Sequence, residues 1–196
     1  IYKQFPYGKT SHITRGILIM EITIRQEEKR DYTTVYNLIK AAFANTQESD
    51  HREHLLVERL RRSDAFIPEL SLVAETQNGT IVGYILLTKV EIASAEKKVL
   101  SLGLAPVAVL PEYQNRGIGS ALIKEAHNRA VAAGYRSVVL LGHKDYYPRF
   151  GYKKAIDYDI HFPFDVPPEF CMVKELAPNS LNEVHGVVQY DPKFTE

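Results

Sequence analysis

The sequence predicts an α/β protein with a central mixed β-sheet flanked by helices, and three observations support this fold class. Segments with the alternating pattern of strands and segments with the helical spacing of apolar residues follow one another in the order βααβββαβαββ. The dipeptide Asn78-Gly79 separates two apolar segments, which is a strong signal for a β-hairpin. A long apolar strand at residues 98–110 leads through a loop with two glycines into an amphipathic helix.

The first half of the chain places two helices between its first two strands. Residues 20–25 alternate isoleucine with polar residues and predict a strand. Asp31 is a suitable N-cap for a first helix, and a second helix is expected at residues 50–62. The inward-facing residues share the helical spacing: Val35, Leu38, Ile39, Ala42 and Phe43 in the first helix, and Leu55, Leu56 and Leu60 in the second. Strands at residues 72–75 and 81–90 flank the hairpin turn, and a polar connection at residues 93–98 follows.

The second half contains one long helix and several short elements. The helix that follows the glycine loop ends at Gly134, which is suited to the C′ position. Its buried stripe is expected to hold Ile118, Leu122, Ile123, Ala126, Ala130 and Val131. A strand at residues 136–141 and a short helix at residues 146–149 come next. The remaining elements are a loop at residues 179–183 and strands at residues 152–156, 170–176 and 187–190.

Composition limits the class of protein. The chain has 196 residues, of which 45% are hydrophobic, and this suits a single globular domain with a real core. Its 24 basic residues balance its 24 acidic residues, so nothing points to nucleic acid. No apolar stretch approaches the roughly 20 residues of a membrane span, so we expect no membrane association. The single cysteine, Cys171, is expected to be a buried small hydrophobe and indicates a reducing cytoplasm.

The first nineteen residues differ from the rest. They have no clean period and lack the pattern of a signal peptide, whereas a regular alternating strand begins at Met20. We therefore expect residues 1–19 to be an N-terminal leader or an artificial extension of the natural chain, with a genuine N-terminal arm as the alternative. Residues 20–196 are expected to form one domain.

The loop between the long strand and the helix contains Gly117 and Gly119. A strand, tight turn, glycine loop and helix in this order direct several free backbone N–H groups at one point, which binds phosphate. A dinucleotide-binding fingerprint fits poorly, because Leu122 occupies the position of the third glycine and no acidic residue lies at residues 136–141. The Gly-Lys-Ser/Thr of a kinase-type P-loop is also missing.

Two motifs resemble those of the GNAT superfamily of N-acetyltransferases. Gln114-x-x-Gly117-x-Gly119 is similar to the coenzyme A pyrophosphate loop of that family. Tyr147-x-x-x-Gly151 resembles the segment after its fifth strand, although Tyr152 stands where phenylalanine is usual. The resemblance covers about residues 20–176, is strongest over residues 100–152, and implies a GNAT-like acyl-CoA N-acyltransferase fold.

The resemblance implies acetyl-CoA as co-substrate and an amine as acceptor, with no metal, in a monomer or homodimer. The strand before the loop would present its backbone to the pantetheine arm, much as a sheet edge accepts a peptide. Pro106 interrupts this strand and marks a bulge or an edge. The implied cofactor-binding residues are Val107, Ala108, Val109, Gln114, Asn115, Arg116, Gly117, Ile118, Gly119 and Ser120. Plain core positions for the three strand side chains, and a solvated surface position for Arg116, are the alternatives.

Tyr147 is implied as the group that acts on the departing thiolate. The reference pKa of tyrosine is ~10 and that of a thiol is ~8.5, so full proton transfer is uphill by about 1.5 units, or ~2 kcal/mol. A hydrogen bond to the sulfur as charge develops is therefore favoured over an early proton transfer. Tyr146 is the alternative if the motif is displaced by one residue. A core-packing role for Tyr147 also remains.

The group that deprotonates the amine is the least determined part of the site. Many family members carry Glu or Asn at or after the fifth strand, but residues 139–142 contain neither. His143 and Asp145 lie nearby, Glu53 and Glu75 are more distant candidates, and a water relay is the alternative to any of them. The acceptor pocket is expected beside residues 45–51, the second helix and the proline-stiffened residues 162–169.

Three functions agree with this pattern. The first is an acetyltransferase that moves acetyl from acetyl-CoA to a primary amine of a small molecule or protein by direct attack in a ternary complex. The second is a non-catalytic acyl-CoA-binding sensor or scaffold, which would need the glycine loop but no tyrosine. The third is a transferase for a longer acyl-CoA. His51 and His54 lack the spacing of a zinc-binding H-E-x-x-H helix, so they indicate a polar helix face and no metal site.

Overall fold

The computed structural model describes residues 10–13, 20–46 and 49–195. Within these residues the strands form a mixed sheet in the order β1-β2-β3-β4-β5-β6-β9-β7, and β10 pairs with both β4 and β8. The strands are β1 (Thr10–Ile13), β2 (Met20–Gln26), β3 (Phe66–Thr76), β4 (Ile81–Ala93), β5 (Lys98–Val109), β6 (Ser137–Leu141), β7 (Lys153–Lys154), β8 (Ile160–His161), β9 (Cys171–Glu175) and β10 (Gly186–Gln189). The pairs β5–β6 and β8–β10 are parallel, so the mixed sheet predicted from the sequence is confirmed.

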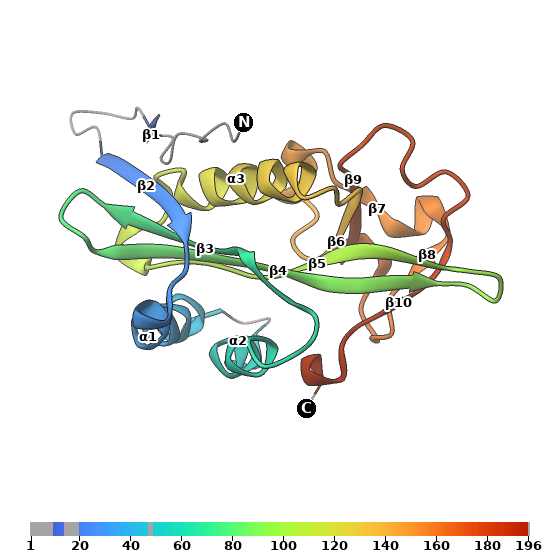
Figure 1. Cartoon of the computed structure of the whole chain (residues 1–196), viewed down its shortest axis with the longest axis horizontal. Coiled ribbons are helices and arrows are strands. Elements are labelled where there is room, and N and C mark those ends of the chain that lie inside the picture. The colour runs from blue at the N-terminus through green and yellow to red at the C-terminus, as the bar shows by residue number, and fades with distance from the viewer. Residues whose placement is uncertain (1–9, 14–19, 47–48, 196) are drawn as a thin grey trace, which may run out of the picture.

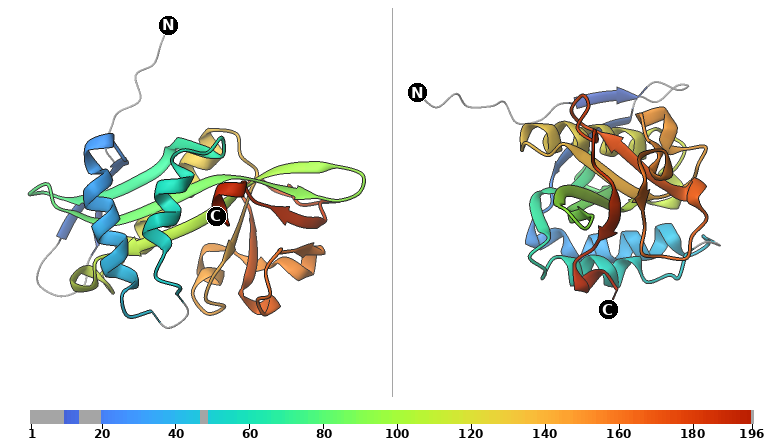
Figure 2. Two further views of the ribbon diagram at one scale, coloured as in Figure 1. Left: turned by 90° about the horizontal axis from the view of Figure 1, so that it is seen from below. Right: turned by 90° about the vertical axis from the view of Figure 1, so that its right-hand side faces the viewer.

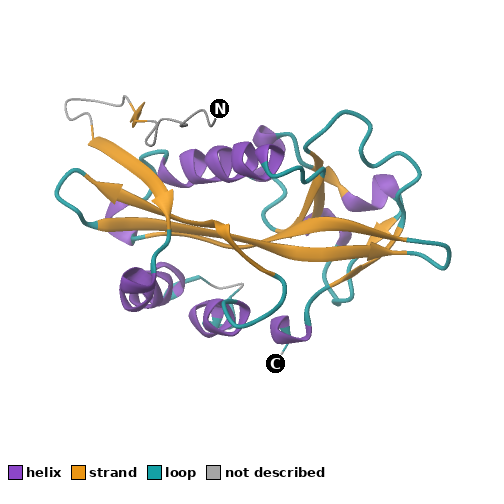
Figure 3. Ribbon diagram, in the orientation of Figure 1, coloured by secondary structure: helices purple, strands orange, loops and turns teal. Residues whose placement is uncertain are grey.

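Helices cover both faces of this sheet, as predicted (Figures 1 and 3). The long helix α3 (Ile118–Ala132) lies on one face, and α1 (Tyr32–Phe43) and α2 (Glu53–Leu60) lie on the other. Short 3-10 turns complete the chain: η1 (Lys29–Asp31), η2 (Pro111–Tyr113), η3 (Tyr147–Phe150), η4 (Ala155–Tyr158), η5 (Pro168–Phe170) and η6 (Pro192–Phe194). One apolar cluster fills the space beneath α3 and a second fills the space beneath α1 and α2, so each helix layer has its own core.

A buried polar network fastens α2 to the sheet. Arg61, at the C-cap of α2, forms an ion pair with Glu27, and both side chains are almost fully buried. Ser71 donates a hydrogen bond from Oγ to Glu27 Oε2 at 2.7 Å, and the Tyr84 hydroxyl lies 2.9 Å from the same Oγ. Burial raises the pKa of Tyr84 above its usual range. Each of these polar groups has a hydrogen-bond partner, which offsets the free-energy cost of burying it. The network thereby fixes the position of α2 on the sheet.

One prediction about the first helices is confirmed in position and one is wrong in detail. Asp31 is the N-cap of α1, as predicted, but its side chain makes no capping hydrogen bond, because its backbone is already helical and its carboxylate accepts bonds from Arg25 and from the N–H of Glu28. On α2 the fully buried residues are His54, Val57 and Leu60, whereas Leu55 and Leu56 are half-buried. His54 turns inward because α2 packs against α1 as well as the sheet, and its ring meets that of Tyr36 edge-on at 4.6 Å.

Two further predictions fail in the second half. Val131 is 51% exposed, because it lies one position round α3 from the buried Ala130 and faces solvent. The strand expected at residues 152–156 shrinks to β7, because the chain turns at the buried Ala155 into η4. Gly134, in contrast, has a φ of 87° directly after the C-cap of α3, so its predicted role as helix terminator is confirmed.

Part of the predicted leader belongs to the sheet. Residues Thr10–Ile13 form β1, which pairs antiparallel with Met20–Thr23 of β2. The remainder of residues 1–19 lies outside the described residues. Whether this segment is native or an extension stays a prediction. No helix within the described ranges has both the length and the apolarity needed to cross a bilayer.

Candidate active site

Strands β5 and β6 separate in the middle of the sheet. Among the described residues they pair only through Leu102–Val138 and Gly103–Val139, and beyond Gly103 the described partner of β6 is β9. At the same place the β4–β5 ladder shifts register opposite Ala105 and Pro106, which confirms the bulge predicted at this proline. Consequently β5 presents the backbone of residues 104–109 along an edge that has no strand partner among the described residues.

The β4–β5 ladder decides which backbone groups of this edge are free. Leu110 donates from its N–H to the carbonyl oxygen of Val82 at 3.0 Å. The backbone N–H and C=O groups of successive residues point to opposite sides of an antiparallel strand. Those of Ala108 therefore point to Tyr84 of β4, whereas those of Val107 and Val109 point to the gap beside β6. Of the three strand residues predicted to present their backbone, two therefore have polar groups on the open side and Ala108 does not.

The loop after β5 exposes the first turn of α3. Asn115 and Gly117 both adopt left-handed backbone conformations, with φ of 59° and 81°, and Gly117 is the N-cap. The first intrahelical bond runs from the N–H of Ala121 to Gly117, so the N–H groups of Ile118, Gly119 and Ser120 have no partner within the helix. No described side chain caps this end. The start of α3 therefore has the free donors and positive dipole end that a phosphate binds.

Two polar side chains brace the loop from outside. Gln114 donates from Nε2 to the carbonyl oxygen of Val109 at 3.0 Å, which ties the loop to the open edge of β5. Arg116 donates from Nη2 to the carbonyl oxygen of Glu112 at 2.8 Å, and its guanidinium lies 5.4 Å from the ring centre of Tyr113. Arg116 is exposed at the surface in this conformation.

The two adjacent tyrosines after β6 have different neighbours. Both donate their backbone N–H to the carbonyl oxygen of His143. The Tyr146 hydroxyl lies beside the start of α3, at 3.4 Å from where a Cβ on Gly119 would be. Arg149 stacks over the Tyr146 ring at 4.4 Å. Tyr147 is buried in the core beneath α3, Tyr146 is partly buried against the same core, and the two rings meet edge-on at 5.2 Å.

Tyr147 is 8% exposed, and the end of β6 is shaped to receive its ring. A Cβ on Gly142 would lie only 2.2 Å from Cε2 of Tyr147, so only glycine fits at this position. Burial raises the pKa of Tyr147 above its usual range, and the neighbouring Tyr146 adds to this. No described residue hydrogen-bonds its hydroxyl. The importance of Gly142 was missed from the sequence, although a glycine directly after a buried strand was a usable signal.

Tyr152 takes part in a buried polar contact that phenylalanine could not make. Its hydroxyl is 2.8 Å from Nε2 of His127 on α3, and its ring meets that of Tyr147 edge-on at 5.6 Å. Burial, with a smaller contribution from Lys174, lowers the pKa of His127 to about 4, so the imidazole is neutral near pH 7. The contact joins the segment after η3 to α3, and thereby supports the position of Tyr147.

The candidates for a general base are placed very differently. His143 and Asp145 are exposed on the loop after β6. Glu75 is engaged by Arg25, whose Nε lies 2.6 Å from its Oε2. Glu53, the first residue of α2, has one buried carboxylate oxygen that no described residue hydrogen-bonds. The sequence alone could not separate Glu53 from Glu75 in this way.

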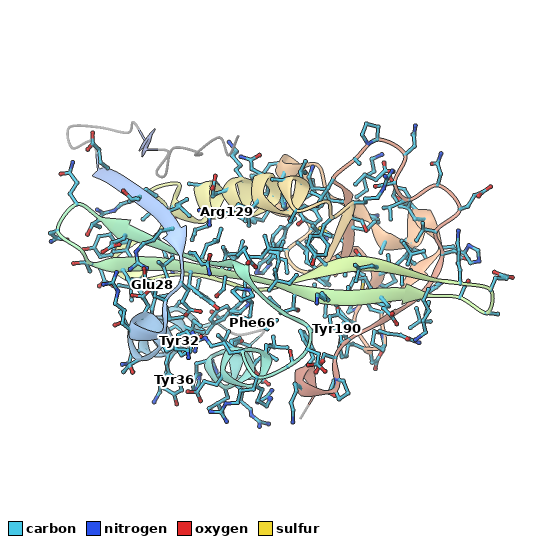
Figure 4. All side chains as sticks on the ribbon, in the orientation of Figure 1. Glu28, Tyr32, Tyr36, Phe66, Arg129 and Tyr190 are labelled. Atoms are coloured by element: carbon cyan, nitrogen blue, oxygen red, sulfur yellow. The ribbon has the colours of Figure 1, made fainter. Side chains whose placement is uncertain are left out.

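Aromatic side chains from the C-terminal part of the chain gather on the face that carries α1 and α2. The rings of Phe164, Tyr190 and Phe194 lie within 6.1 Å of one another, and burial raises the pKa of Tyr190. Tyr190 lies close under the sheet (Figure 4), 3.5 Å from where a Cβ on Gly103 would be. This cluster therefore reaches the point at which β5 and β6 separate, and includes part of the predicted pocket wall at residues 162–169.

Metal chemistry has no support from side-chain grouping. Over the described part of the chain, no three His, Cys, Asp or Glu residues are grouped so that they could hold a metal ion. Cys171 is buried, as expected, and burial raises the pKa of its thiol.

Comparison with known proteins decides the family. Residues 23–155 match a family model described as an acetyltransferase (GNAT) domain. The chain belongs to the GNAT acetyltransferase family. Its separated β5 and β6, its glycine loop and its tyrosine segment all fall inside the matched region, so the motifs noted in the sequence and the GNAT domain coincide.

Individual GNAT relatives match over most of the chain. The uncharacterized N-acetyltransferase YhbS of Escherichia coli is 32% identical over 171 residues, which are 87% of this chain and 97% of the relative. The uncharacterized N-acetyltransferase YjhQ of the same organism is 33% identical over 77% of this chain and 81% of its own. Both relatives carry the name of N-acetyltransferase, in agreement with the family match.

Two solved GNAT structures share the fold closely. The Escherichia coli YhbS structure in complex with CoA has a TM-score of 0.81 and 28% identity, and the match covers 93% of this chain and 97% of that one. A GNAT family acetyltransferase from Brucella melitensis in complex with acetyl-CoA has a TM-score of 0.72 and 32% identity, over 88% and 97% of the two chains. The predicted GNAT-like fold is therefore confirmed.

Proposed function

We propose that the protein is an acetyl-CoA-dependent N-acetyltransferase that moves the acetyl group to a primary amine of a small molecule or protein by direct attack in a ternary complex. One observation carries the proposal: the edge of β5 at residues 104–109, which has no strand partner among the described residues, leads directly to the N–H groups at the start of α3 that have no partner within the helix. The complexes of the two relatives with CoA and acetyl-CoA support the same cofactor. The lone buried Cys171 supports a reducing cytoplasm as its compartment.

The residues present fit coenzyme A. The N–H groups of Ile118, Gly119 and Ser120 would hold the diphosphate, and glycine at position 119 leaves the backbone accessible. Val107 and the N–H of Val109 offer the open backbone groups that a pantetheine amide needs. The carbonyl of Val109 is already occupied by Gln114, which holds the loop against the strand. Bound acetyl-CoA would supply the acetyl group as a thioester.

Each side chain then has a limited task. A backbone N–H of the β5 edge polarises the thioester carbonyl, because a fixed donor stabilises the negative charge that develops on the oxygen. The Tyr147 hydroxyl donates a hydrogen bond to the sulfur as the C–S bond breaks. Since burial raises the pKa of Tyr147, full proton transfer is even less favourable than reference values indicate. The thiolate therefore takes its proton from water after it leaves.

The amine loses its proton without a dedicated carboxylate on β6. An amine with a lysine-like pKa of ~10.4 is about 0.1% neutral or less at pH 7. His143 and Asp145 are exposed, so water reaches this end of the sheet and can carry the proton away. The N–C bond forms from the neutral fraction of the amine.

The deciding experiment measures release of free thiol from acetyl-CoA across a broad panel of amines. We expect release that depends on the amine and that a longer acyl-CoA supports less well. Binding of acetyl-CoA with no thiol release for any amine would overturn the proposal in favour of an acyl-CoA sensor. Faster transfer from a longer acyl-CoA would retain transfer and change the donor.

A further inference from the structure

Tyr146 brings a hydroxyl to the start of α3. This hydroxyl lies 3.4 Å from where a Cβ on Gly119 would be, and Cγ2 of Val109 lies 3.7 Å from the same point. The hydroxyl therefore borders both the first turn of α3 and the last residue of the open edge of β5. The left-hand view of Figure 2 shows the loop before α3 and the segment after β6 along the same edge of the molecule.

The ring that carries this hydroxyl is held in place by the fold, whereas the hydroxyl itself is unused. The ring is partly buried against the core beneath α3 and meets the rings of Tyr147 and Phe150 at 5.2 and 5.4 Å. The N–H of Tyr146 donates to the carbonyl oxygen of His143 at 3.0 Å. No described residue hydrogen-bonds the hydroxyl. A donor that is positioned in advance in this way lowers the cost of binding.

Arg149 adds a positive charge beside the same ring. Its guanidinium lies 4.4 Å from the ring centre of Tyr146, and its Nε donates to the carbonyl oxygen of Tyr146 at 2.9 Å. The side chain is exposed and forms no ion pair with a described carboxylate. Stacking and the bond through Nε orient the guanidinium and leave its two terminal nitrogens available. A planar guanidinium of this kind is well suited to bind phosphate oxygens.

The occupant that suits these groups is a phosphate. The tyrosine hydroxyl, the guanidinium and the N–H groups of the first turn of α3 are all hydrogen-bond donors, so they share a need for an acceptor. The charge of Arg149 and the positive end of the helix dipole both favour an anionic acceptor. Coenzyme A carries a diphosphate and a separate 3′-phosphate on its ribose. Because the Tyr146 hydroxyl borders Gly119, whose N–H is assigned to the diphosphate, the diphosphate is the expected partner.

We propose that Tyr146 and Arg149 are binding residues for the diphosphate of acetyl-CoA, so that the adjacent Tyr146 and Tyr147 divide binding and chemistry between them. The inference rests on the proposed acetyltransferase function and deepens it. Tyr146 donates from its hydroxyl to a diphosphate oxygen, and Arg149, held over the ring, supplies positive charge. Tyr147, buried in the core beneath α3, acts on the sulfur alone.

Calorimetric titration of Tyr146→Phe with acetyl-CoA tests the role of the hydroxyl. Phenylalanine keeps the ring and its packing and removes the hydroxyl alone. We expect acetyl-CoA to bind about tenfold more weakly, which corresponds to roughly 1.4 kcal/mol. The melting temperature and the kcat at saturating acetyl-CoA should not change, because the hydroxyl has no partner among the described residues. Acetyl-dephospho-CoA, which keeps the diphosphate and lacks the 3′-phosphate, should show the same tenfold loss.

Arg149→Gln tests the role of the charge. We expect acetyl-CoA to bind about fivefold more weakly at low salt, as for opposite charges about 4 Å apart in water. The guanidinium is exposed, so this loss should shrink at ~1 M salt, where the Debye length is ~3 Å. The loss in Tyr146→Phe, which removes a direct hydrogen bond, should persist at high salt. Arg149→Lys keeps the charge without the planar shape and should lie between the wild type and Arg149→Gln.

A second stacked pair provides the matched control. Nζ of Lys153 lies 5.7 Å from the ring centre of Tyr158, and Tyr158 packs against a different apolar cluster from Tyr146. The variants Lys153→Gln and Tyr158→Phe remove a charge and a hydroxyl of the same kinds outside the proposed phosphate site. Both should bind acetyl-CoA as the wild type does.

Several results would overturn the inference. Unchanged affinity in a folded Tyr146→Phe protein would remove the hydroxyl from the site, and a lower kcat with unchanged affinity would assign it to chemistry. A lower melting temperature with the same loss would assign it to the fold, and an equal loss in the control variants would make the effect unspecific. A loss for acetyl-CoA but not for acetyl-dephospho-CoA would move the contact to the 3′-phosphate. These titrations need no turnover, so they decide the inference even if a wild type that binds acetyl-CoA releases no thiol and the proposed transfer fails.

Discussion

Gly119→Glu tests the assignment of the diphosphate to the start of α3. A Cβ at this position would lie 3.4 Å from the Tyr146 hydroxyl and 3.7 Å from Cγ2 of Val109, which are ordinary contacts. The added carboxylate extends further and brings negative charge to the diphosphate. Two charges ~4 Å apart repel by about 1 kcal/mol in water and about 4 kcal/mol at an effective dielectric constant of ~20. Bulk adds to this repulsion, so we expect acetyl-CoA to bind at least about tenfold more weakly, or roughly 1.4 kcal/mol.

Calorimetric titration with acetyl-CoA measures this loss, and Gly119→Ala is the matched control. Alanine adds the same Cβ without charge, so it should keep most of the wild-type affinity. The fold should tolerate glutamate, because a negative side chain in the first turn of a helix is favourable. Unchanged affinity in a folded Gly119→Glu protein would refute the assignment. An equal loss in both variants would show that space, and not charge, is limiting.

Four further predictions follow from the site. Tyr147→Phe should lower kcat by about 100-fold with nearly unchanged acetyl-CoA affinity, whereas full activity combined with loss in Tyr146→Phe would transfer the role to Tyr146. Gly142→Ala should lower kcat as well, because its Cβ would displace the Tyr147 ring, and an active variant would refute the packing argument. The pH profile of kcat/KM should follow the pKa of each amine, and a fixed inflection near ~6.5 that vanishes in His143→Ala would identify a base. Because the pKa of His127 is lowered to about 4 in the fold, the unfolded chain binds the extra proton first. Denaturant unfolding should therefore show stability falling by about 2 kcal/mol from His127 between pH ~7 and ~5, and this part of the loss should disappear in His127→Gln.

The sequence by itself determined those features that depend on local backbone requirements. The glycine loop before α3 can be predicted from the sequence, because Gly117 adopts a left-handed backbone conformation that few other residues adopt. Similar local requirements make three other features predictable from the sequence: the hairpin at Asn78-Gly79, the bulge at Pro106 and the end of α3 at Gly134. Each depends on residues close together in the chain.

The tertiary structure alone decided how distant residues meet. Tyr146 and Tyr147 are adjacent and chemically alike, and only packing against Gly119 on one side and Gly142 on the other gives them different surroundings. The backbone polar groups of Ala108 do not lie at the open edge, because its pairing with β4 directs them to that strand. Sequence gives no means to distinguish Glu53 from Glu75, but Arg25 pairs with Glu75, and no described residue pairs with Oε2 of Glu53. Burial and partner choice depend on contacts between segments far apart in the chain, and local patterns do not encode them.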